Sequence, residues 1–156
     1  MRGARIAIDP EPARLAKAQE FGAVATIDPT AVRATTALRD LTGGTGVPLV
    51  LQTSGATRAA GDGLASLAPW GRMCVVGLGG EVRFSVLDMH RCQMTLMASW
   101  SMSIVQQRRC AEFVARNELP VDDLFSHHWR LDQVVEAYEG FGRPPAGKGV
   151  IVFDES

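Results

Sequence analysis

The sequence is poor in the features that mark nucleic-acid-binding and membrane-bound proteins. Its 16 Lys and Arg residues against 17 Asp and Glu give a formal net charge of −1, so no basic field favours nucleic acid or an anionic membrane. No apolar run approaches the roughly 20 residues that cross a bilayer. The N-terminal MRGARIAIDPEP lacks the apolar core of a secretory signal. We therefore expect a cytoplasmic protein without nucleic-acid or membrane partners.

Cysteine is scarce as well. The three cysteines, Cys74, Cys92 and Cys110, form no CxxC or Cys/His pair with the spacing of a zinc finger. An odd number without such spacing is typical of free thiols in a reducing compartment, where cysteine behaves as a small buried hydrophobe. The cysteines therefore predict structural roles and no metal site.

Up to about residue 80, apolar runs alternate with amphipathic segments. The runs predict strands in RIAID (5–9), AVATID (23–28), PLVLQTSG (48–55) and RMCVVGLGG (72–80). The segments between them predict helices over 13–21, 29–41 and 57–67, which end at glycine or near proline. This alternation is typical of an α/β fold with a doubly wound parallel sheet.

After residue 80 the regular alternation of strand and helix patterns ends. EVRFSVL (81–87) and MTLMAS (94–99) predict short strands, and 121–129 an extended piece. Helices are expected over 103–119 and 130–141, and a final strand over 147–155. The change near residue 102 predicts a boundary between two segments.

The order of five segments resembles the C-terminal part of zinc-dependent medium-chain alcohol dehydrogenases. The segments are AIDPEPARLAKAQEFGA, LTGGTGVPLVLQTSG, LAPWGRMCVVGLGG, HHWRLDQVVEAYEGF and GKGVIVF. The resemblance covers residues 1–153. It implies that 1–102 form a partial Rossmann-like NAD(P)-binding domain, lacking the first strand and its glycine-rich loop. It also implies that 103–156 correspond to the segment that rejoins the catalytic domain in that family.

The resemblance further implies reversible hydride transfer between an alcohol and a nicotinamide cofactor, aided by a zinc ion that polarises the alcohol oxygen. The part of the family that carries the zinc ligands has no counterpart here, so we identify no catalytic or metal-binding residue. We expect part of an NAD- and zinc-dependent enzyme that is inactive alone. The alternative is a non-catalytic nucleotide-binding or oligomerisation module derived from the family.

Asp9, at the end of the first predicted strand, has two open interpretations. A carboxylate there can accept hydrogen bonds from the adenosine ribose and repel a 2′-phosphate, which favours NAD over NADP. The same residue before Pro-Glu-Pro is also a good helix N-terminal signal. The resemblance favours ribose binding, and it places the basic Arg14 near the same ribose, where its charge softens the exclusion of NADP.

The stretch GLGGE (77–81) does not satisfy the G-x-G-x-x-G spacing, because Val82 stands where the third glycine would fall. From the residues alone it is a turn after a parallel strand. The resemblance instead places backbone of Val76, Gly77 and Leu78 along the nicotinamide ring.

The resemblance implies further cofactor contacts in three other segments. It places Thr53, Ser54 and Gly55 beside the adenine and ribose, although Gln52 and Pro48 stand where the family often has acids. The backbone of Met97 and Ser99 is expected at the nicotinamide carboxamide. Lys148 is expected to reach the pyrophosphate, which lysine suits as a point charge.

The histidines predict no metal site. His127 and His128 are neighbours in an extended segment, so their side chains point to opposite faces. His90 lies beside Arg91 in an expected polar turn, and all three histidines are interpreted as structural.

The missing first strand would be central in a doubly wound sheet, and its loss would leave backbone groups unpaired. RIAID could move into the vacant position, a strand could be exchanged with a second copy, or the gap could leave a marginal sheet. We expect a homodimer, because the family pairs these domains through the region of 81–99. The missing catalytic domain, supplied in trans, is the other expected partner.

Overall fold

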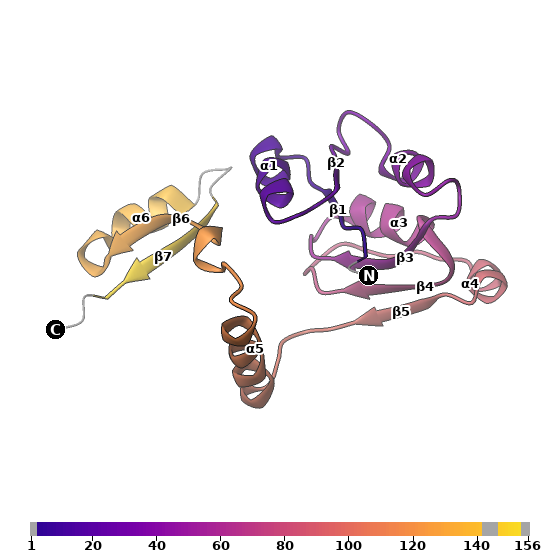
Figure 1. The fold of residues 1–156 in the computed structure, drawn as a ribbon. Coiled ribbons are helices and arrows are strands. Elements are labelled where there is room, and N and C mark those ends of the chain that lie inside the picture. The colour runs from indigo at the N-terminus through magenta and orange to yellow at the C-terminus, as the bar shows by residue number, and fades with distance from the viewer. Residues whose placement is uncertain (1–2, 142–146, 154–156) are drawn as a thin grey trace. The chain divides into compact units, whose positions relative to one another are not determined.

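The computed structural model describes residues 3–141 and 147–153 and divides the chain into two compact units. Unit 1 is Met1–Ser101 and unit 2 is Met102–Ser156 (Figure 1). The elements of unit 1 are β1 (Ile6–Ile8), α1 (Pro12–Glu20), β2 (Ala25–Ile27), α2 (Ala34–Leu41), β3 (Val47–Gln52), α3 (Thr57–Ala65), β4 (Leu67–Val75), α4 (Val86–Cys92) and β5 (Thr95–Ala98). Strands and helices alternate, and every strand pair is parallel, which confirms the predicted α/β class.

The strands of unit 1 form two separate sheets. One contains β1 and β2, and the other has the order β3-β4-β5. The predicted single sheet is therefore interrupted between β1 and β3, the two strands that would flank the missing one. Among the described strands β1 pairs with β2 alone, so RIAID does not occupy the vacant position.

Local sequence explains how α1 begins and ends. The Glu11 carboxylate accepts a hydrogen bond from the Ala13 N–H at 3.4 Å, and Pro12 occupies the first helical position, where its missing N–H costs nothing. The helix ends at Phe21, and Gly22 follows with φ of 87°, a left-handed conformation that glycine adopts without strain.

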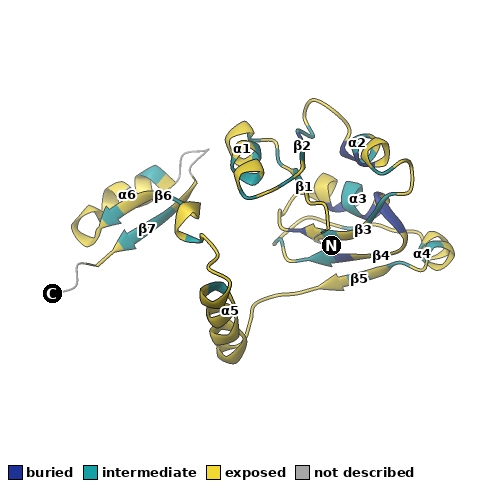
Figure 2. Ribbon diagram, in the orientation of Figure 1, coloured by how far each residue is buried: buried dark blue, intermediate teal, exposed yellow. Residues whose placement is uncertain are grey.

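Two apolar clusters hold unit 1 together, and the buried residues gather around α2, α3 and the strands beside them (Figure 2). Met73 of β4 is 0% exposed and packs with Ala60, Leu64 and Leu67, which fixes α3 on the larger sheet. The second cluster contains Ile27, Ala34 and Leu38; Ile6 of β1 and Val47 of β3 both pack against it.

Unit 2 contains a helix followed by a parallel strand pair with its own helix. Its elements are α5 (Ile104–Arg116), η1 (Asp122–Leu124), β6 (Phe125–Arg130), η2 (Leu131–Gln133), α6 (Val134–Phe141) and β7 (Lys148–Val152). Strands β6 and β7 pair in parallel, and Trp129 lies over Gly149, where any Cβ would collide with the indole ring. Glycine at 149 is therefore required by the packing of this tryptophan.

Three sequence predictions are wrong in detail. Residues 81–87 do not form a strand, because Ser85 caps a helix that begins at Val86; its hydroxyl accepts from the Asp88 N–H at 3.3 Å. This helix also contains His90, which was expected in a turn. The helix expected from residue 29 begins at Ala34, since Asp28 first closes a turn by accepting from the Thr30 N–H at 2.7 Å.

No helix in the described part of the chain is long and apolar enough to span a membrane.

Candidate functional site

Most of the predicted site residues lie at the carboxyl ends of the parallel strands in unit 1. Asp9 follows β1, residues 53–55 follow β3, residues 76–78 follow β4, and Ser99 follows β5, which contains Met97. In open α/β sheets ligands bind outside these strand ends. The structure therefore places these residues at strand ends where a ligand could bind.

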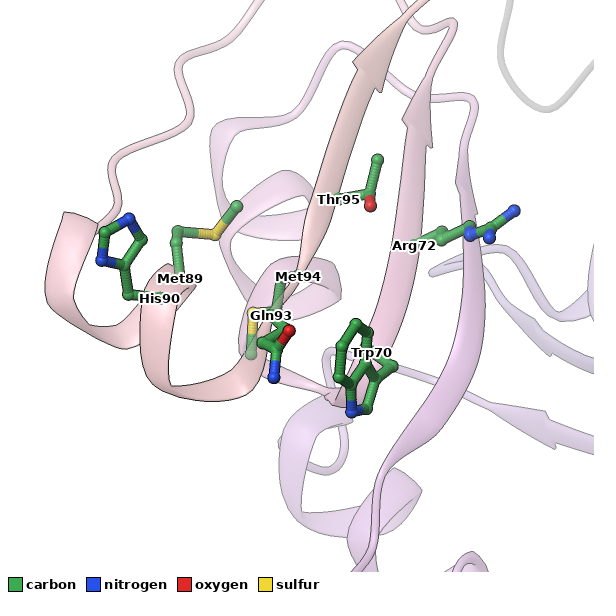
Figure 3. A pocket seen from close by; sticks show the side chains of 7 residues that line it. All are labelled: Trp70, Arg72, Met89, His90, Gln93, Met94 and Thr95. Atoms are coloured by element: carbon green, nitrogen blue, oxygen red, sulfur yellow. The ribbon is translucent and has the colours of Figure 1, made fainter.

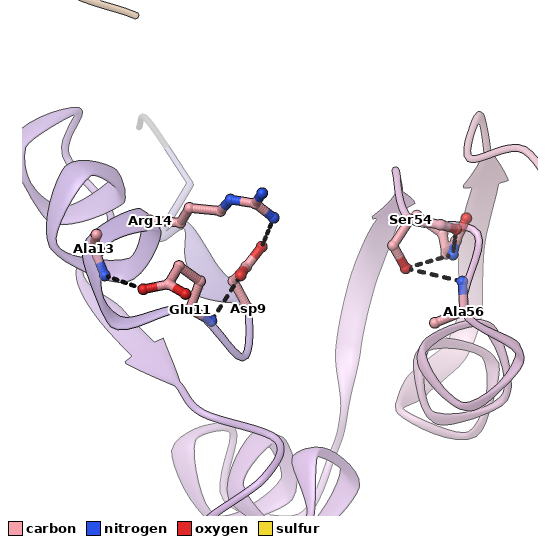
Figure 4. A network of polar contacts seen from close by, with 7 residues as sticks. Asp9, Glu11, Ala13, Arg14, Ser54 and Ala56 are labelled. Carbon is pink, nitrogen blue, oxygen red and sulfur yellow. Dashed lines mark hydrogen bonds and ion pairs between the residues drawn. The ribbon is translucent and has the colours of Figure 1, made fainter. Parts of the chain in front are cut away.

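Asp9 is held in place by its own turn. One carboxylate oxygen accepts from the Glu11 N–H at 2.9 Å, and the other lies 3.6 Å from an Arg14 guanidinium nitrogen (Figure 4). The Asp9 side chain is 28% exposed and that of Arg14 is 58% exposed. An ion pair this exposed contributes little stability, but it orients the carboxylate and lowers its net negative field.

Asp9 is not the N-cap of α1, because Glu11 fills that position. The structure therefore contradicts the interpretation of Asp9 as the cap of this helix. The carboxylate keeps a partly exposed face at the end of β1, which is the arrangement that hydrogen bonding to a ribose requires.

The loops after β3 and β4 pack backbone against backbone. A Cβ at Gly55 would collide with the Leu78 carbonyl, and one at Gly77 would collide with the Ser54 carbonyl. A Cβ at Gly80, which has φ of 74°, would lie 2.8 Å from the Gly55 oxygen. Gly77 and Gly80 of GLGG are thus needed for contact between two loops, a role that the turn interpretation did not include.

Gln52 is a residue whose role the sequence did not reveal. It is 6% exposed; its amide nitrogen donates to the Ser54 carbonyl and, at 3.2 Å, to the Ser54 hydroxyl. Its amide oxygen is buried without a hydrogen-bond partner among the described residues. Gln52 therefore ties the 53–55 loop to the end of β3. The sequence feature that could have pointed to this role is the glutamine itself, which stands where the family often has an acid.

The N–H groups around the β4 end are already used. Those of Val76 and Gly77 donate to the Gln52 carbonyl at 2.9 and 3.1 Å, and that of Ser99 donates to Val75 at 2.9 Å. Any ligand here would meet the carbonyl oxygens of these residues rather than their N–H groups.

Lys148 lies in unit 2, as the first residue of β7, and is exposed. Its carbonyl accepts from the Ser126 hydroxyl at 3.2 Å. It is thus not among the residues that the structure groups at the strand ends of unit 1.

The histidines of β6 form aromatic contacts. His127 stacks on Trp129 with ring centroids 5.4 Å apart, and its Nδ1 lies 2.8 Å from the Ser126 hydroxyl. His128 meets the ring of Phe125 edge to face. Within residues 3–141 and 147–153, no group of three or more His, Cys, Asp or Glu could hold a metal ion. The residues present therefore do not fit a zinc ion.

A pocket of about 590 Å³ lies elsewhere, at the amino ends of the strands (Figure 3). It is lined by Trp70, Arg72, Met89, His90, Gln93, Met94 and Thr95. Trp70 there has φ of 63°, an uncommon backbone conformation for a bulky side chain. Because Thr95 begins β5, the pocket lies at the opposite end of the sheet from the predicted cofactor residues.

Parallel strands joined by crossover helices give unit 1 a Rossmann-like α/β architecture. Residues 1–117 match the family of zinc-binding dehydrogenases. The chain belongs to that family.

A curated relative agrees with this assignment, and two solved structures have the same fold. The zinc-type alcohol dehydrogenase-like protein YphC of Escherichia coli K12, itself described as uncharacterized, is 33% identical over 163 residues; the match covers 99% of this chain and 44% of that protein. The solved structure of alcohol dehydrogenase TADH from Thermus sp. ATN1 is 24% identical with a TM-score of 0.89, covering 97% of this chain and 44% of that one.

A putative zinc-binding dehydrogenase from Sinorhizobium meliloti 1021, solved bound to NADP, is 22% identical with a TM-score of 0.79; the match covers 96% of this chain and 44% of that chain. The chain thus spans less than half the length of these proteins. The two solved structures confirm the Rossmann-like fold.

Proposed function

We propose that this chain forms most of the cofactor-binding part of an NAD-dependent, zinc-dependent alcohol dehydrogenase, and that it is inactive alone. The whole enzyme transfers a hydride between an alcohol carbon and the nicotinamide ring, and the cofactor carries that chemistry. The chain's own residues bind and orient the cofactor. Because the described residues do not fit a zinc ion, no step at a metal is assigned to them.

The observation that carries the proposal is the Asp9 carboxylate, oriented by Glu11 and partly exposed where β1 ends. Such a carboxylate accepts hydrogen bonds from ribose hydroxyls and repels a 2′-phosphate. Arg14, 3.6 Å away, reduces that repulsion. Since a structurally similar protein was solved with NADP, the fold alone does not select the cofactor, and the selectivity assigned to Asp9 is a separate claim.

The remaining contacts follow from which backbone N–H groups are already donated. The carbonyl oxygens of Val76, Gly77 and Ser99 would accept from the nicotinamide carboxamide, since their N–H groups are already donated. Thr53, Ser54 and Gly55 would border the adenosine, and the backbone of Leu78 and Met97 would lie along the nicotinamide. Lys148 would supply a positive charge to the pyrophosphate.

Calorimetry with NAD and NADP tests the cofactor assignment. The chain should bind NAD more tightly than NADP, and Asp9→Asn should reduce that preference by about tenfold, since it removes the charge that repels the 2′-phosphate. Asp28→Asn is the matched control, because Asp28 also follows a strand but lies outside the proposed contacts. If neither cofactor binds, the proposal fails and the alternative of a non-catalytic oligomerisation module is favoured.

Inactivity is tested by incubating the purified chain with NAD, zinc and short alcohols while following absorbance of the reduced cofactor. We expect none to form. Zinc-dependent formation of reduced cofactor would contradict the proposal that catalysis requires residues outside this chain. The proposed setting is the cytoplasm, in line with the free cysteines Cys74, Cys92 and Cys110.

A further inference from the structure

The start of β4 contains an irregularity that presents a tryptophan to solvent. The paired positions advance from 47 to 49 in β3 but from 67 to 72 in β4, so β4 carries extra residues there. Trp70 lies within this bulge, and its side chain is 67% exposed. Bulges re-aim side chains and are common beside functional sites. The irregularity therefore turns Trp70 out of the strand, into the lining of the pocket at the amino ends of the strands.

The backbone of the bulge is strained and tightly closed. Gln93 also lines the pocket with a positive φ, but it is the C-cap of α4, where that conformation is common. Trp70, with φ of 63°, ends no helix. A Cβ at Gly71 would lie 2.7 Å from the Ala68 oxygen, so the turn has little room to relax. Such strain persists where the surrounding structure holds it, and it gathers at ligand sites.

The pocket has an excess of positive charge. Arg72 of β4 pairs in register with Thr95 of β5, so both side chains project from the same face of the sheet. That face is opposite to the one covered by α3, because the neighbouring Met73 packs against α3. Arg72 has no hydrogen bond or ion pair to any residue that the structure describes, and no Asp or Glu is among the described lining residues. An unpaired guanidinium without nearby carboxylates favours an anionic ligand.

The rest of the lining supplies an apolar surface. Met89 and Met94 pack on one side against the cluster around α3 and also line the pocket. In Figure 3 Met89 lies on one side of the pocket, and Trp70 and Arg72 lie on the other. Thioethers adapt to the shape of a ligand and contact aromatic rings favourably, and an exposed indole offers a stacking surface. This side of the pocket therefore fits an aromatic ring.

We propose that the pocket binds a small planar aromatic carboxylate. The carboxylate pairs with the Arg72 guanidinium and accepts a hydrogen bond from the Thr95 hydroxyl, and the ring lies against Trp70 and the two methionines. The volume of about 590 Å³ is in the range of small-molecule sites. An inorganic anion would leave the apolar side unused, and a neutral aromatic would leave the guanidinium unpaired. The two sides together select this class of ligand.

This site is separate from the proposed cofactor site. Thr95 begins β5, whereas the residues assigned to the cofactor in unit 1 gather at the carboxyl ends of the strands. The inference therefore does not rest on the proposed function, and its test is carried out without NAD. Failure to bind NAD and failure to bind the aromatic acid are distinguishable results.

The test uses the full chain, labelled for NMR, and 2-naphthoate as the probe. The indole N–H signal of Trp70 should shift saturably with one probe bound per chain, while those of Trp100 and Trp129 stay in place. 2-Naphthamide has the same ring without the charge and should bind at least about tenfold more weakly. No saturable shift of the Trp70 signal overturns the proposal, and so does equal affinity for the acid and the amide.

A matched pair of variants localises the charge. Arg72→Gln should weaken binding of 2-naphthoate by at least about tenfold, because it removes the guanidinium that the carboxylate meets. Arg91→Gln is the control, since Arg91 lies in the last turn of α4 but not in the lining of the pocket. Equal weakening by both variants would show that net charge alone attracts the probe, and the site would be refuted.

A third variant tests the aromatic side. Trp70→Gly removes the ring, and the chain should still fold, because glycine adopts a φ of 63° without strain. Circular dichroism checks the fold, and calorimetry with 2-naphthoate measures binding, which should be lost. Undiminished binding by the folded variant would overturn the proposal.

Discussion

Gly77 shapes the candidate site because it has no side chain. Its Cα faces the Ser54 carbonyl so closely that a methyl group would collide with it. The contact joins the loops after β3 and β4, so a larger residue at 77 must separate them. At the scale of single residues, this backbone contact sets the loop geometry.

Gly77→Ala should therefore destabilise the chain by about 1–3 kcal/mol, the usual cost of overpacking. Gly61→Ala is the control, since no atom lies within 4 Å of a Cβ there. Gly61 lies inside α3, where alanine should stabilise by about 0.5–1 kcal/mol. Urea unfolding followed by circular dichroism measures both, and equal effects would refute the assigned contact.

Asp28 gives a pH-dependent prediction. Hydrogen bonds from the Thr30 hydroxyl, and then from the Thr30 N–H, lower the pKa of its carboxyl below the ordinary value. A lowered folded-state pKa stabilises the fold above the unfolded-state pKa, near pH 4, and this contribution is lost as the pH falls through the folded-state pKa. Thr30→Val should raise the Asp28 pKa, as measured by NMR titration; an unchanged pKa would contradict the assigned cause.

At the scale of elements, apolar runs predicted most strands and helices, because their periodicity reports which face is buried. The errors arose where local hydrogen bonds compete with that pattern. Ser85 caps α4 within a stretch of strand-like composition, and Asp28 delays the start of α2. The split between the two sheets was not predictable from periodicity, because strand pairing depends on residues distant in sequence.

For the candidate site, the sequence predicted where most of the residues lie, and their role in binding a cofactor stays a prediction. The positions at strand ends followed from the strands themselves. The loop–loop contact of Gly55 and Gly77 could not be predicted, since it depends on the separation of neighbouring strands. The burial of Gln52 could not be predicted from the sequence either, because a glutamine at a strand end is ordinarily exposed.

In unit 2, Gly149→Ala should weaken the β6–β7 pair by about 1–3 kcal/mol, because the new methyl group would displace the Trp129 ring. Gly140→Ala is the control, since a Cβ there would lie 3.5 Å from the same ring, an ordinary contact distance. Amide exchange of β7 residues measures the effect. Faster exchange in the Gly140 variant than in the Gly149 variant would contradict the packing assignment.

At the scale of the whole molecule, we propose a homodimer formed through the outer edge of β5. Trp100, just after that strand, is 81% exposed, and Met97 within it is 46% exposed. Light scattering should give a dimeric mass, and Met97→Lys should shift the equilibrium toward monomer, because it places a charge at the contact. A monomeric mass at all concentrations would refute this interface.

The separation of unit 1 into two sheets also bears on how the chain unfolds. The sheets are joined by the apolar cluster on α2 and by a hydrogen bond from Arg58 of α3 to the carbonyl of Pro29, in the turn after β2, at 3.0 Å. A continuous ladder would make strand melting cooperative, whereas this junction lets β1 and β2 detach while β3, β4 and β5 persist. Probes of the two sheets should therefore report unfolding transitions that do not coincide, and a single shared transition would contradict this independence.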